Sequence, residues 1–396
     1  MNCNFSILFR KYEKKILILH SVGSVKNQIS EAPKKTKKHM GIKEGNALKT
    51  IGIFKDSFPP IMDGVSLATK NYVHWLHQKN QAVCVITPKA PDYSDNEPYS
   101  IYRYTSIPIL MRKPYRFGMP DIDFSYKREI NKIQFGLVHA HCPFSSGKEA
   151  LRIARNQKIP LVATFHSKYR DDFEQSTKNK FIAHQMTNEI IRFFEKADEV
   201  WIPQAAVEET IREYGFKGKV QVVENGNDFA TSAPIDPIKK AARKKLNLVD
   251  NELMFLFVGQ HIWEKNTRLI IESLAGIKEL PFRMFFVGTG YAKSDLEELT
   301  EKLGLQEKVR FVGVITGRDE LREYYAAADL FLFPSMYDNA PLVIREAGAM
   351  ETPSILVSGS TSAENITDNF NGFLIENSIG SMTAKLRELI ENPEDY

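Results

Sequence analysis

Two carboxylates near the end of the chain lie close enough in sequence to bind hydroxyl groups of one ligand. Asp338 occupies a polar loop after an apolar strand, and Glu346 follows after seven intervening residues, inside an expected helix. Pro341 suits the first turn of that helix, because its missing N–H would have no intrahelical partner there. The helix start therefore presents free backbone N–H groups and the positive end of the helix dipole to an anion. These N–H groups belong to Ala340, Leu342 and Val343.

An anion site flanked by two hydroxyl-binding carboxylates suits a sugar nucleotide. The phosphate would rest on the helix start, Glu346 would accept hydrogen bonds from hydroxyls beside it, and Asp338 would accept from hydroxyls on the far side. The same strand–loop–helix–strand unit also occurs in α/β proteins of other functions, where an acid at a helix start is only a cap.

Two strands expected in the first half also end near residues that could contact a ligand. The strand Thr50–Phe54 leads to Gly64, where the absence of a side chain would let a phosphate approach the backbone closely. The strand Leu161–Phe165 ends at His166, which would point toward a ligand at the strand end. Each residue also has a structural interpretation, as a turn glycine and as a core histidine.

The second half repeats this arrangement. The strand Leu253–Val258 is followed by Gln260 and Lys265, and the lysine ammonium could reach a diphosphate or simply lie in solvent. The strand Arg283–Val287 ends at Gly288, the first glycine of a Gly-x-Gly that lacks the third glycine of the dinucleotide-binding fingerprint.

Size and composition indicate a globular protein of more than one domain. The 396 residues suffice for two domains with full cores, and 43% hydrophobic with 26% charged residues is ordinary for a soluble protein. The three cysteines lie far apart and offer no disulfide framework, which favours a reducing, cytoplasmic location. No apolar run reaches the roughly 20 residues of a membrane span, so any membrane contact would be peripheral.

The charge is distributed unevenly along the chain. Residues 1–50 carry 11 Lys/Arg against 3 Glu, residues 101–200 carry 17 basic and 11 acidic groups, and residues 231–396 carry 18 basic and 25 acidic groups. An acidic second half argues against nucleic-acid binding along the whole chain. The basic first half suits a domain that rests on an anionic surface such as a membrane.

Short apolar strands alternate with amphipathic helical segments from Thr50 onward, which predicts parallel sheets covered on both faces. The alternation pauses at the turn-rich cluster Glu224–Asp228 and then restarts. We therefore predict an α/β protein with two doubly wound Rossmann-like domains that face each other across a cleft, with ligands at the carboxyl ends of the strands. The domains are expected at residues 50–228 and 229–396, after a basic, poorly ordered extension at residues 1–49.

Eight short motifs, in this order, resemble the retaining family 4 glycosyltransferases, which have the two-Rossmann GT-B fold. The resemblance covers residues 50–392 and is carried by the motifs together, since each alone is short. The motifs are Phe58-Pro59-Pro60 with Gly64, His139-Ala140-His141, Thr164-Phe165-His166, Glu224-Asn225-Gly226, Glu264-Lys265, Val287-Gly288-Thr289-Gly290, Phe311-Val312-Gly313-Val314, and Asp338 with Glu346.

The resemblance implies an acceptor-side domain at residues 50–228 and a donor-binding domain at residues 229–396. Asp338 would lie near the hydroxyls of the donor sugar and Glu346 would hold the ribose. Lys265 would bind the donor diphosphate and His166 would meet the sugar, so His166, Asp338 and Lys265 are the expected catalytic residues. The expected donor-binding residues are Gly64, Gln260, Lys265, Gly288, Val314, Asn339, Ala340, Pro341, Leu342 and Glu346.

Three features depart from the family pattern. Gln260 replaces an arginine, Asp338 replaces a longer glutamate, and the chain ends at Tyr396, where family members continue with a helix that returns to the first domain. The donor-binding domain is therefore expected to be truncated at its C-terminus. These departures motivate one alternative function, a catalytically impaired sugar-nucleotide-binding protein. A second alternative is a nucleotide-sugar epimerase of similar build.

The implied reaction moves a hexose from a UDP- or GDP-linked donor to a hydroxyl acceptor with retained configuration. Lys265, the Gly64 loop and the helix start would stabilise the leaving diphosphate, so no metal and no other cofactor is expected. The sequence Asp121-Ile122-Asp123 resembles a metal-binding Asp-x-Asp, but it lies in an expected loop and is interpreted as a coincidence.

The acceptor is expected to be a membrane lipid or another cell-envelope glycoconjugate. The segment Arg112–Gly118 is basic and aromatic, which suits a lipid headgroup region, although a solvated loop would have the same composition. This segment resembles that of lipid-modifying members of the family. The expected location is the cytoplasm, with peripheral contact at the inner face of an anionic membrane, and no nucleic-acid partner is expected.

Overall fold

The computed structural model describes residues 49–61, 63–110, 114–229, 231, 233–249 and 251–392. The expectations about the N-terminal extension up to residue 48, about Arg112 and Lys113, and about the last four residues lie outside the described residues. The described residues divide into two compact units, one comprising those up to Thr164 together with Arg192–Trp201, and the other comprising Phe165–Ile191 and those from Ile202 onward. Each unit is described by itself.

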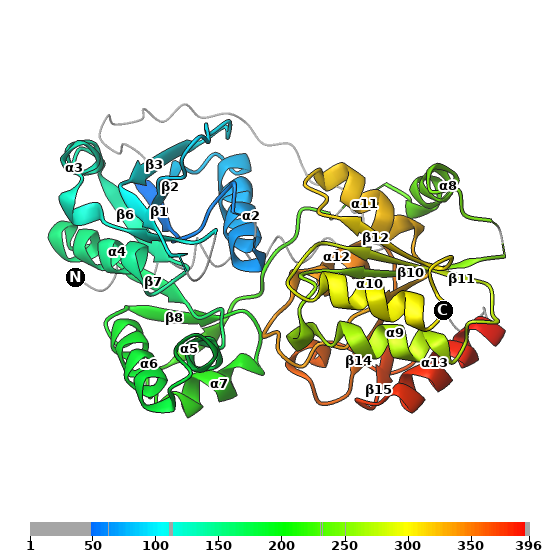
Figure 1. The fold of residues 1–396 in the computed structure, drawn as a ribbon. Helices are drawn as coiled ribbons and strands as arrows, with labels where there is room; N and C mark the ends of the chain where they lie inside the picture. Colours follow the sequence, from blue (N-terminus) through cyan, green and yellow to red (C-terminus); the bar gives the residue numbers. More distant parts are fainter. Residues whose placement is uncertain are drawn as a thin grey trace, which may run out of the picture. The chain divides into compact units, whose positions relative to one another are not determined.

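The first sheet has seven strands in the order β3-β2-β1-β6-β7-β8-β9 (Figure 1). The pairs from β3 through β8 are parallel, and β1, β2 and β7 are buried along nearly their whole length. Parallel strands buried on both faces have continuous apolar sequences, as these do. The strands are β1 Thr50–Phe54, β2 Val83–Pro88, β3 Ser100–Tyr104, β6 Phe135–Ala140, β7 Leu161–Thr164, β8 Glu199–Ile202 and β9 Val220–Val222.

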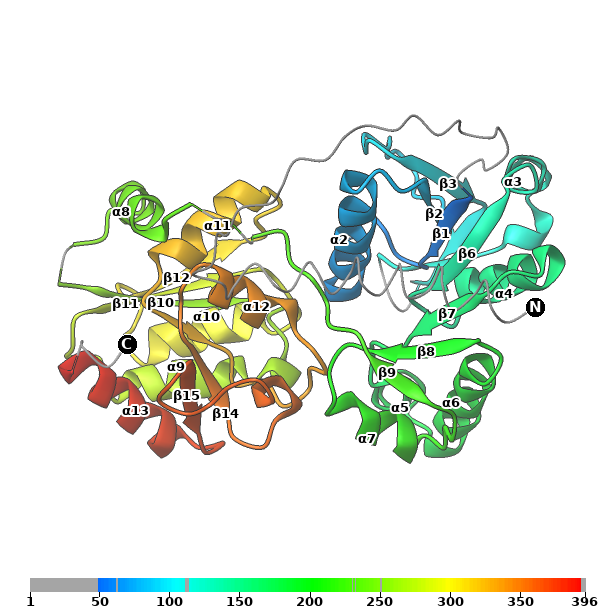
Figure 2. The ribbon, with the colours of Figure 1, turned by 180° about the vertical axis from the view of Figure 1, so that it is seen from behind.

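Helices cover both faces of this sheet. Helix α2 (Gly64–Gln78) lies on one side, and α3 (Phe124–Ile130) and α4 (Ser145–Gln157) lie on the opposite side (Figures 1 and 2). Helix α2 begins where Asp63 accepts a hydrogen bond from the backbone N–H of Ser66 at 2.7 Å, an N-cap that satisfies one of the helix's free donors. Helices α5 (Tyr169–Thr177), α6 (Lys180–Phe194) and α7 (Val207–Glu213) follow.

The second sheet has six parallel strands in the order β12-β11-β10-β13-β14-β15. Its core is rich in aromatic rings, and Phe257 and Phe331 each stack on Phe333. Helices α9, α10 and α13 cover one face, and α8, α11 and α12 cover the other (Figures 1 and 2). The strands are β10 Leu253–Val258, β11 Phe282–Val287, β12 Val309–Gly313, β13 Leu330–Leu332, β14 Ser354–Val357 and β15 Gly372–Ile375. The helices are α8 Ile235–Lys245, α9 Thr267–Ala275, α10 Lys293–Lys302, α11 Arg318–Ala327, α12 Leu342–Ala349 and α13 Ile379–Glu391.

The prediction of two Rossmann-like α/β sheets is confirmed, whereas the domain boundary at residue 228 stays a prediction. The structure adds elements that the sequence pattern did not reveal. Helix α8 lies in a segment that looked like a polar linker because of its two prolines, but Pro237 falls in the first helical turn, where proline is tolerated. The other added elements are β3, α3, α5, β15, and a small antiparallel ribbon of β4 (Ser106–Pro108) and β5 (Arg116–Gly118). Among the described residues, no helix has both the length and the apolar character that crossing a membrane requires.

Asp329, which directly precedes β13, joins helix α8 to the second sheet. Its buried carboxylate accepts hydrogen bonds from Lys239 Nζ at 2.9 Å, from Arg243 Nη1 at 2.8 Å and from the backbone N–H of Met254 at 2.8 Å. Removal of this carboxylate would leave the backbone N–H of Met254 and the Lys239 ammonium without this acceptor, and Arg243 with backbone oxygens only.

We therefore expect Asp329→Ala to lower the free energy of unfolding by about 2–4 kcal/mol. Glu323→Ala is the matched control, because Glu323 pairs with Lys245 of the same helix at the exposed surface. The control should leave the free energy of unfolding nearly unchanged, because exposed ion pairs contribute little to stability. Urea unfolding followed by circular dichroism measures both, and equal losses in the two variants would contradict the role of Asp329.

Candidate functional site

Two residues predicted as catalytic, Lys265 and Asp338, are in direct contact. Lys265 ends the short 3-10 helix η4 (Trp263–Lys265) after β10, and Asp338 lies in the loop after β13. Nζ of Lys265 donates to Oδ1 of Asp338 at 2.5 Å, and Oγ of Ser335 donates to Oδ2 at 2.6 Å. The ammonium also lies 5.2 Å from the ring centre of Phe333. A ligand diphosphate would therefore compete with Asp338 for this ammonium.

The start of helix α12 lies directly after this loop. Pro341 occupies the N-cap, one position before the predicted first turn, and no side chain caps the helix. Asn339 is buried; its Nδ2 donates to the backbone oxygen of His166 at 3.1 Å, and its Oδ1 has no hydrogen-bond partner among the described residues. A buried acceptor without a partner costs about 1–3 kcal/mol, so a ligand hydroxyl at this position would be stabilising.

The predicted residue His166 lies beside the same loop. It is buried just beyond the end of β7, and the residues after it bond to the loop that carries Asp338. Lys168 Nζ donates to the backbone oxygen of Met336 at 3.3 Å, and the Tyr337 hydroxyl donates to Oδ1 of Asp172 at 2.6 Å. The structure thus brings His166, Lys265 and Asp338 into one neighbourhood of the second unit.

Glu346 lies inside α12 and is only 1% exposed. Oε1 accepts from Nη2 of Arg318 at 2.6 Å, and Oε2 accepts from the hydroxyl of Tyr325 at 2.8 Å. Burial, followed by the charge of Glu346, holds the pKa of Tyr325 well above its ordinary value, so the phenol remains a donor. Each carboxylate oxygen keeps a second lone pair that a ribose hydroxyl could use.

Arg318 is itself held in place by Asp228. Its Nε and Nη2 donate to the two oxygens of Asp228 at 2.9 and 2.6 Å, and its guanidinium lies 4.2 Å from the ring centre of Phe229. Burial works to lower the pKa of Arg318, but the bonds to Asp228 and the charge of Glu346 raise it above its ordinary value. Burial works to raise the pKa of Asp228, but the hydrogen bonds from Arg318 and the positive charge of Arg318 lower this pKa below its ordinary value. The three charges form one connected group.

Sequence reasoning missed Arg318, Tyr325 and Asp228. They are separated from Glu346 by 28, 21 and 118 residues, so no local spacing connects them. One signal was present, because Arg318 is the first residue of α11, where the helix dipole disfavours a cation. A cation placed against the dipole indicates a specific partner.

Gly288, which follows β11 and was predicted to contact the donor, has to be a glycine for a structural reason. Gly288 has a φ of +129°, and a Cβ on it would lie 2.0 Å from the backbone oxygen of Gly259, so the two loops can approach only without a side chain. Gln260 is exposed in the first of these loops. Val314, predicted to lie near the base, is exposed just beyond β12. Gly64 belongs to the other unit, where it opens α2 with no atom within 4 Å of where a Cβ would be.

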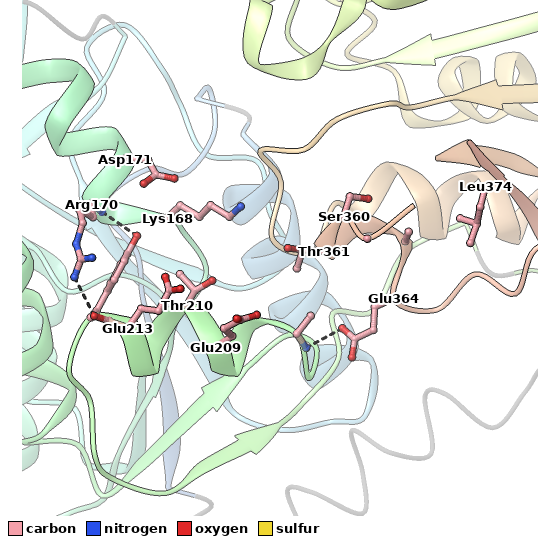
Figure 3. Close-up of a pocket in the computed structure, with 14 residues that line it drawn as sticks. Lys168, Arg170, Asp171, Glu209, Thr210, Glu213, Ser360, Thr361, Glu364 and Leu374 are labelled. Carbon is pink, nitrogen blue, oxygen red and sulfur yellow. Dashed lines mark hydrogen bonds between the residues drawn. The ribbon is translucent and has the colours of Figure 1, made fainter. Parts of the chain in front are cut away.

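A pocket of about 540 Å³ lies within the second unit (Figure 3). Lys168 lines it and also bonds to Met336, so the pocket borders the loop of Asp338. Its wall has two cations but four carboxylates, a composition that suits hydroxyl groups better than an anion. These charged residues are Lys168, Arg170, Asp171, Glu209, Glu213 and Glu364. Partial burial raises the pKa of Asp171 above its ordinary value in spite of the nearby Lys168.

Comparison with known families identifies the chain. Residues 62–230 match the model described as Glycosyltransferase Family 4, and residues 238–396 match the model described as Glycosyl transferases group 1. The chain belongs to the family 4 glycosyltransferases. This glycosyltransferase is 29% identical over 353 residues to the alpha-monoglucosyldiacylglycerol synthase of Streptococcus pneumoniae, covering 87% of this chain and 79% of the relative. It is 24% identical to the enzyme of the same name from Acholeplasma laidlawii, covering 87% and 89%.

Solved structures agree on the fold. The glycosyltransferase is similar to Anabaena Alr3699/HepE in complex with UDP and glucose, with a TM-score of 0.65 at 18% identity, covering 88% of this chain and 91% of that one. It is also similar to sucrose-phosphate synthase from Thermosynechococcus elongatus, with a TM-score of 0.69 at 18% identity and the same coverage. These similarities confirm the GT-B fold. With the family matches, they show a glycosyltransferase, so the epimerase alternative is wrong.

The Asp-x-Asp sequence has a structural role at its second acid. Asp123 is the N-cap of α3, where Oδ1 accepts from the backbone N–H of Tyr126 at 3.0 Å. Its Oδ2 accepts from the backbone N–H of Thr105 at 2.9 Å and from Lys89 Nζ at 3.1 Å. The carboxylate of Asp123 is therefore fully engaged within the fold.

We expect Glu346→Ala to weaken binding of the nucleotide-sugar donor by about 1–3 kcal/mol, because it removes an acceptor for ligand hydroxyls. Tyr325→Phe should weaken binding less, since it keeps the carboxylate and removes only one of its supports. Glu351→Ala, which removes an exposed carboxylate just after the same helix, is the matched control and should leave the affinity unchanged. Calorimetry with UDP-glucose measures all three, and unchanged affinity in Glu346→Ala would contradict the assignment.

Lys265→Ala should weaken UDP binding by about 1.5–3 kcal/mol and leave uridine binding unchanged, because the ammonium is expected to contact only the phosphates. Arg268→Ala removes an exposed cation on the neighbouring helix and controls for the change in net charge. Competition of UDP and uridine with a fluorescent nucleotide measures both affinities. An equal loss for the two ligands would place Lys265 away from the diphosphate.

Proposed function

We propose that this glycosyltransferase moves a hexose, with retention of configuration, from a UDP- or GDP-linked donor to a hydroxyl of a membrane lipid or another cell-envelope glycoconjugate. The observation that carries the proposal is the grouping of Lys265, Asp338 and the uncapped start of α12 beside the unpartnered Oδ1 of Asn339. A cation, open backbone amides and oxygen acceptors in one place match a diphosphate attached to a sugar.

In the reaction that we propose, the bond between the anomeric carbon and the β-phosphate oxygen breaks and the diphosphate leaves with the electron pair. Lys265 and the positive end of α12 stabilise the charge that develops on the phosphates. The acceptor hydroxyl attacks the anomeric carbon from the side that the diphosphate leaves. Its proton passes to a phosphate oxygen of the leaving group. Configuration is retained because the new bond forms on the face from which the diphosphate departs.

We assign the sugar to the space between His166 and Asp338, and the ribose to Glu346. Lys265 is released from Asp338 when the diphosphate binds, and Asp338 then accepts hydrogen bonds from sugar hydroxyls. The remaining donor contacts are proposed for Gly64, Gln260, Gly288, Val314, Asn339, Ala340, Pro341 and Leu342. Because the Lys265 ammonium and the backbone amides at the start of α12 supply positive charge at the leaving group, the reaction that we propose requires no metal.

The acceptor headgroup is assigned to the pocket lined by Lys168, Asp171 and Glu364. Its excess of carboxylates favours an uncharged, hydroxyl-bearing headgroup over a phosphorylated one. The similarity to two alpha-monoglucosyldiacylglycerol synthases supports a glycerolipid acceptor. An enzyme that acts on such a lipid works at a membrane surface, and we propose peripheral contact with an anionic bilayer.

The test is incubation of the full chain with UDP-glucose, UDP-galactose or GDP-mannose and vesicles that contain diacylglycerol. We expect one donor to give a new glycolipid together with the free nucleoside diphosphate, and the anomeric proton signal to show the configuration of the donor. EDTA should leave the rate unchanged. Donor binding without transfer or hydrolysis would instead favour the catalytically impaired binding protein that Gln260 and Asp338 suggested.

A further inference from the structure

Large apolar side chains are exposed in an unusual concentration next to the β4–β5 ribbon. Five of the exposed large apolar side chains among the described residues lie between positions 107 and 124, and α6 with three is the next such group. We call these five the ribbon surface. They are Ile107 at 49% exposure, Leu110 at 76%, Phe117 at 55%, Ile122 at 59% and Phe124 at 80%. Bulky apolar side chains gathered in this way usually mark a surface that binds something.

The pairing of the two strands places Ile107 and Phe117 on one face of the ribbon. Ile107 lies directly opposite Phe117, so their side chains point to the same side. The other side is polar, because Nε of Arg116 donates to the hydroxyl of Ser106 at 2.7 Å. Within the described residues the ribbon therefore has one satisfied polar side and one apolar side open to solvent.

The ribbon is fixed to the domain rather than free to fold its apolar side inward. Gly118 packs on Tyr104 so closely that a Cβ would lie 2.3 Å from the tyrosine ring. The carboxylate of Asp123 accepts from the backbone N–H and hydroxyl of Thr105 at 2.9 and 2.8 Å, which ties the base of the ribbon to the start of α3. This bond places Ile122 and Phe124 beside the base of the ribbon.

The charge near the ribbon surface is of the kind that an anionic membrane attracts. Arg128 and Lys132 are exposed on and after α3, and Lys127, partly exposed beside them, pairs with Asp121 at 3.2 Å. Among the acids nearby, Asp123 is buried in its hydrogen bonds, which leaves Asp121 and Glu129 as the exposed ones. Apart from the Lys127–Asp121 pair, two exposed cations remain for one exposed acid. Apolar side chains next to such a positive excess suit the boundary between lipid headgroups and acyl chains.

We propose that the ribbon surface docks on an anionic lipid bilayer, with Ile107, Leu110 and Phe117 entering the interfacial region and the cations of α3 contacting the headgroups. This inference extends the proposed function, which requires an acceptor in a membrane, but it concerns attachment and not the reaction. Docking would hold the enzyme at the surface from which it takes its acceptor.

The test measures vesicle binding without acceptor or donor, so it does not depend on the transferase reaction. The full chain is sedimented with vesicles of phosphatidylcholine alone or with added phosphatidylglycerol. We expect binding to the anionic vesicles that weakens as the salt concentration rises. The double variant Ile107→Ser with Phe117→Ser should bind these vesicles at least about tenfold more weakly, since two interfacial apolar side chains are lost.

Phe370→Ser is the control, because Phe370 is a phenylalanine in the second unit, before β15, that is even more exposed than Phe117. It should bind vesicles like the unaltered protein. The double variant Phe181→Ser with Ile182→Ser tests the other group of exposed apolar residues, at the start of α6. If the α6 variant loses binding and the ribbon variant keeps it, the ribbon surface is not the docking surface.

A direct measurement guards against misfolding of the ribbon variant. Phe117→Trp keeps an aromatic ring at the surface, and its added fluorescence should shift to shorter wavelength and be quenched by brominated lipids in anionic vesicles. Absence of both changes would overturn the proposal. So would a ribbon variant that changes only the oligomeric state, because the surface would then join copies of this chain. Normal vesicle binding through the ribbon together with no transfer to any lipid would overturn the proposed function and leave the docking surface intact.

Discussion

The buried charge of Glu346 is the interaction on which the candidate site depends. A carboxylate removed from water is costly unless it is paired and hydrogen-bonded, and here Arg318 and Tyr325 bond to both of its oxygens. Arg318 in turn is held by Asp228, which accepts from its Nε and Nη2. The same contacts that stabilise the charge also fix the direction in which Glu346 presents its remaining lone pairs. Stability and ligand binding therefore use one set of contacts.

The second electrostatic feature behaves differently. Lys265 and Asp338 neutralise each other while remaining partly exposed, so a ligand can separate them. Their loops follow β10 and β13, which are neighbours in the sheet, and parallel neighbours end at the same edge. The diphosphate of a bound donor would take the ammonium and free the carboxylate for sugar hydroxyls. Through this exchange of partners, Asp338 would become able to accept hydrogen bonds from the sugar only when the donor has bound.

The departures from the family pattern have a physical interpretation in this arrangement. Gln260, which stands where the family has an arginine, is exposed just after β10. The absence of the arginine charge there leaves no buried group without a partner. Asp338 is one methylene shorter than glutamate, yet it reaches both Lys265 and Ser335. The pocket beside its loop carries more carboxylates than cations, whereas the exposed ribbon in the first unit lies beside an excess of cations. The two regions are thus suited to different chemical groups, hydroxyls in the one and a negatively charged surface in the other.

The sequence by itself determined the two sheets and their parallel strands, because buried parallel strands have continuous apolar runs. It also determined where most of the expected ligand-binding residues lie, because such residues follow the carboxyl ends of the strands. It revealed Lys265, Asp338, His166 and Glu346 as separate candidates. Only the tertiary structure decided that Lys265 pairs with Asp338 and that Glu346 is held by Arg318, Tyr325 and Asp228. Local periodicity records which face of an element is buried, but a contact between residues that are tens of positions apart depends on how the elements pack. The β4–β5 ribbon and helix α8 were missed for a related reason, since short strands and a proline in a first turn leave little periodic signal.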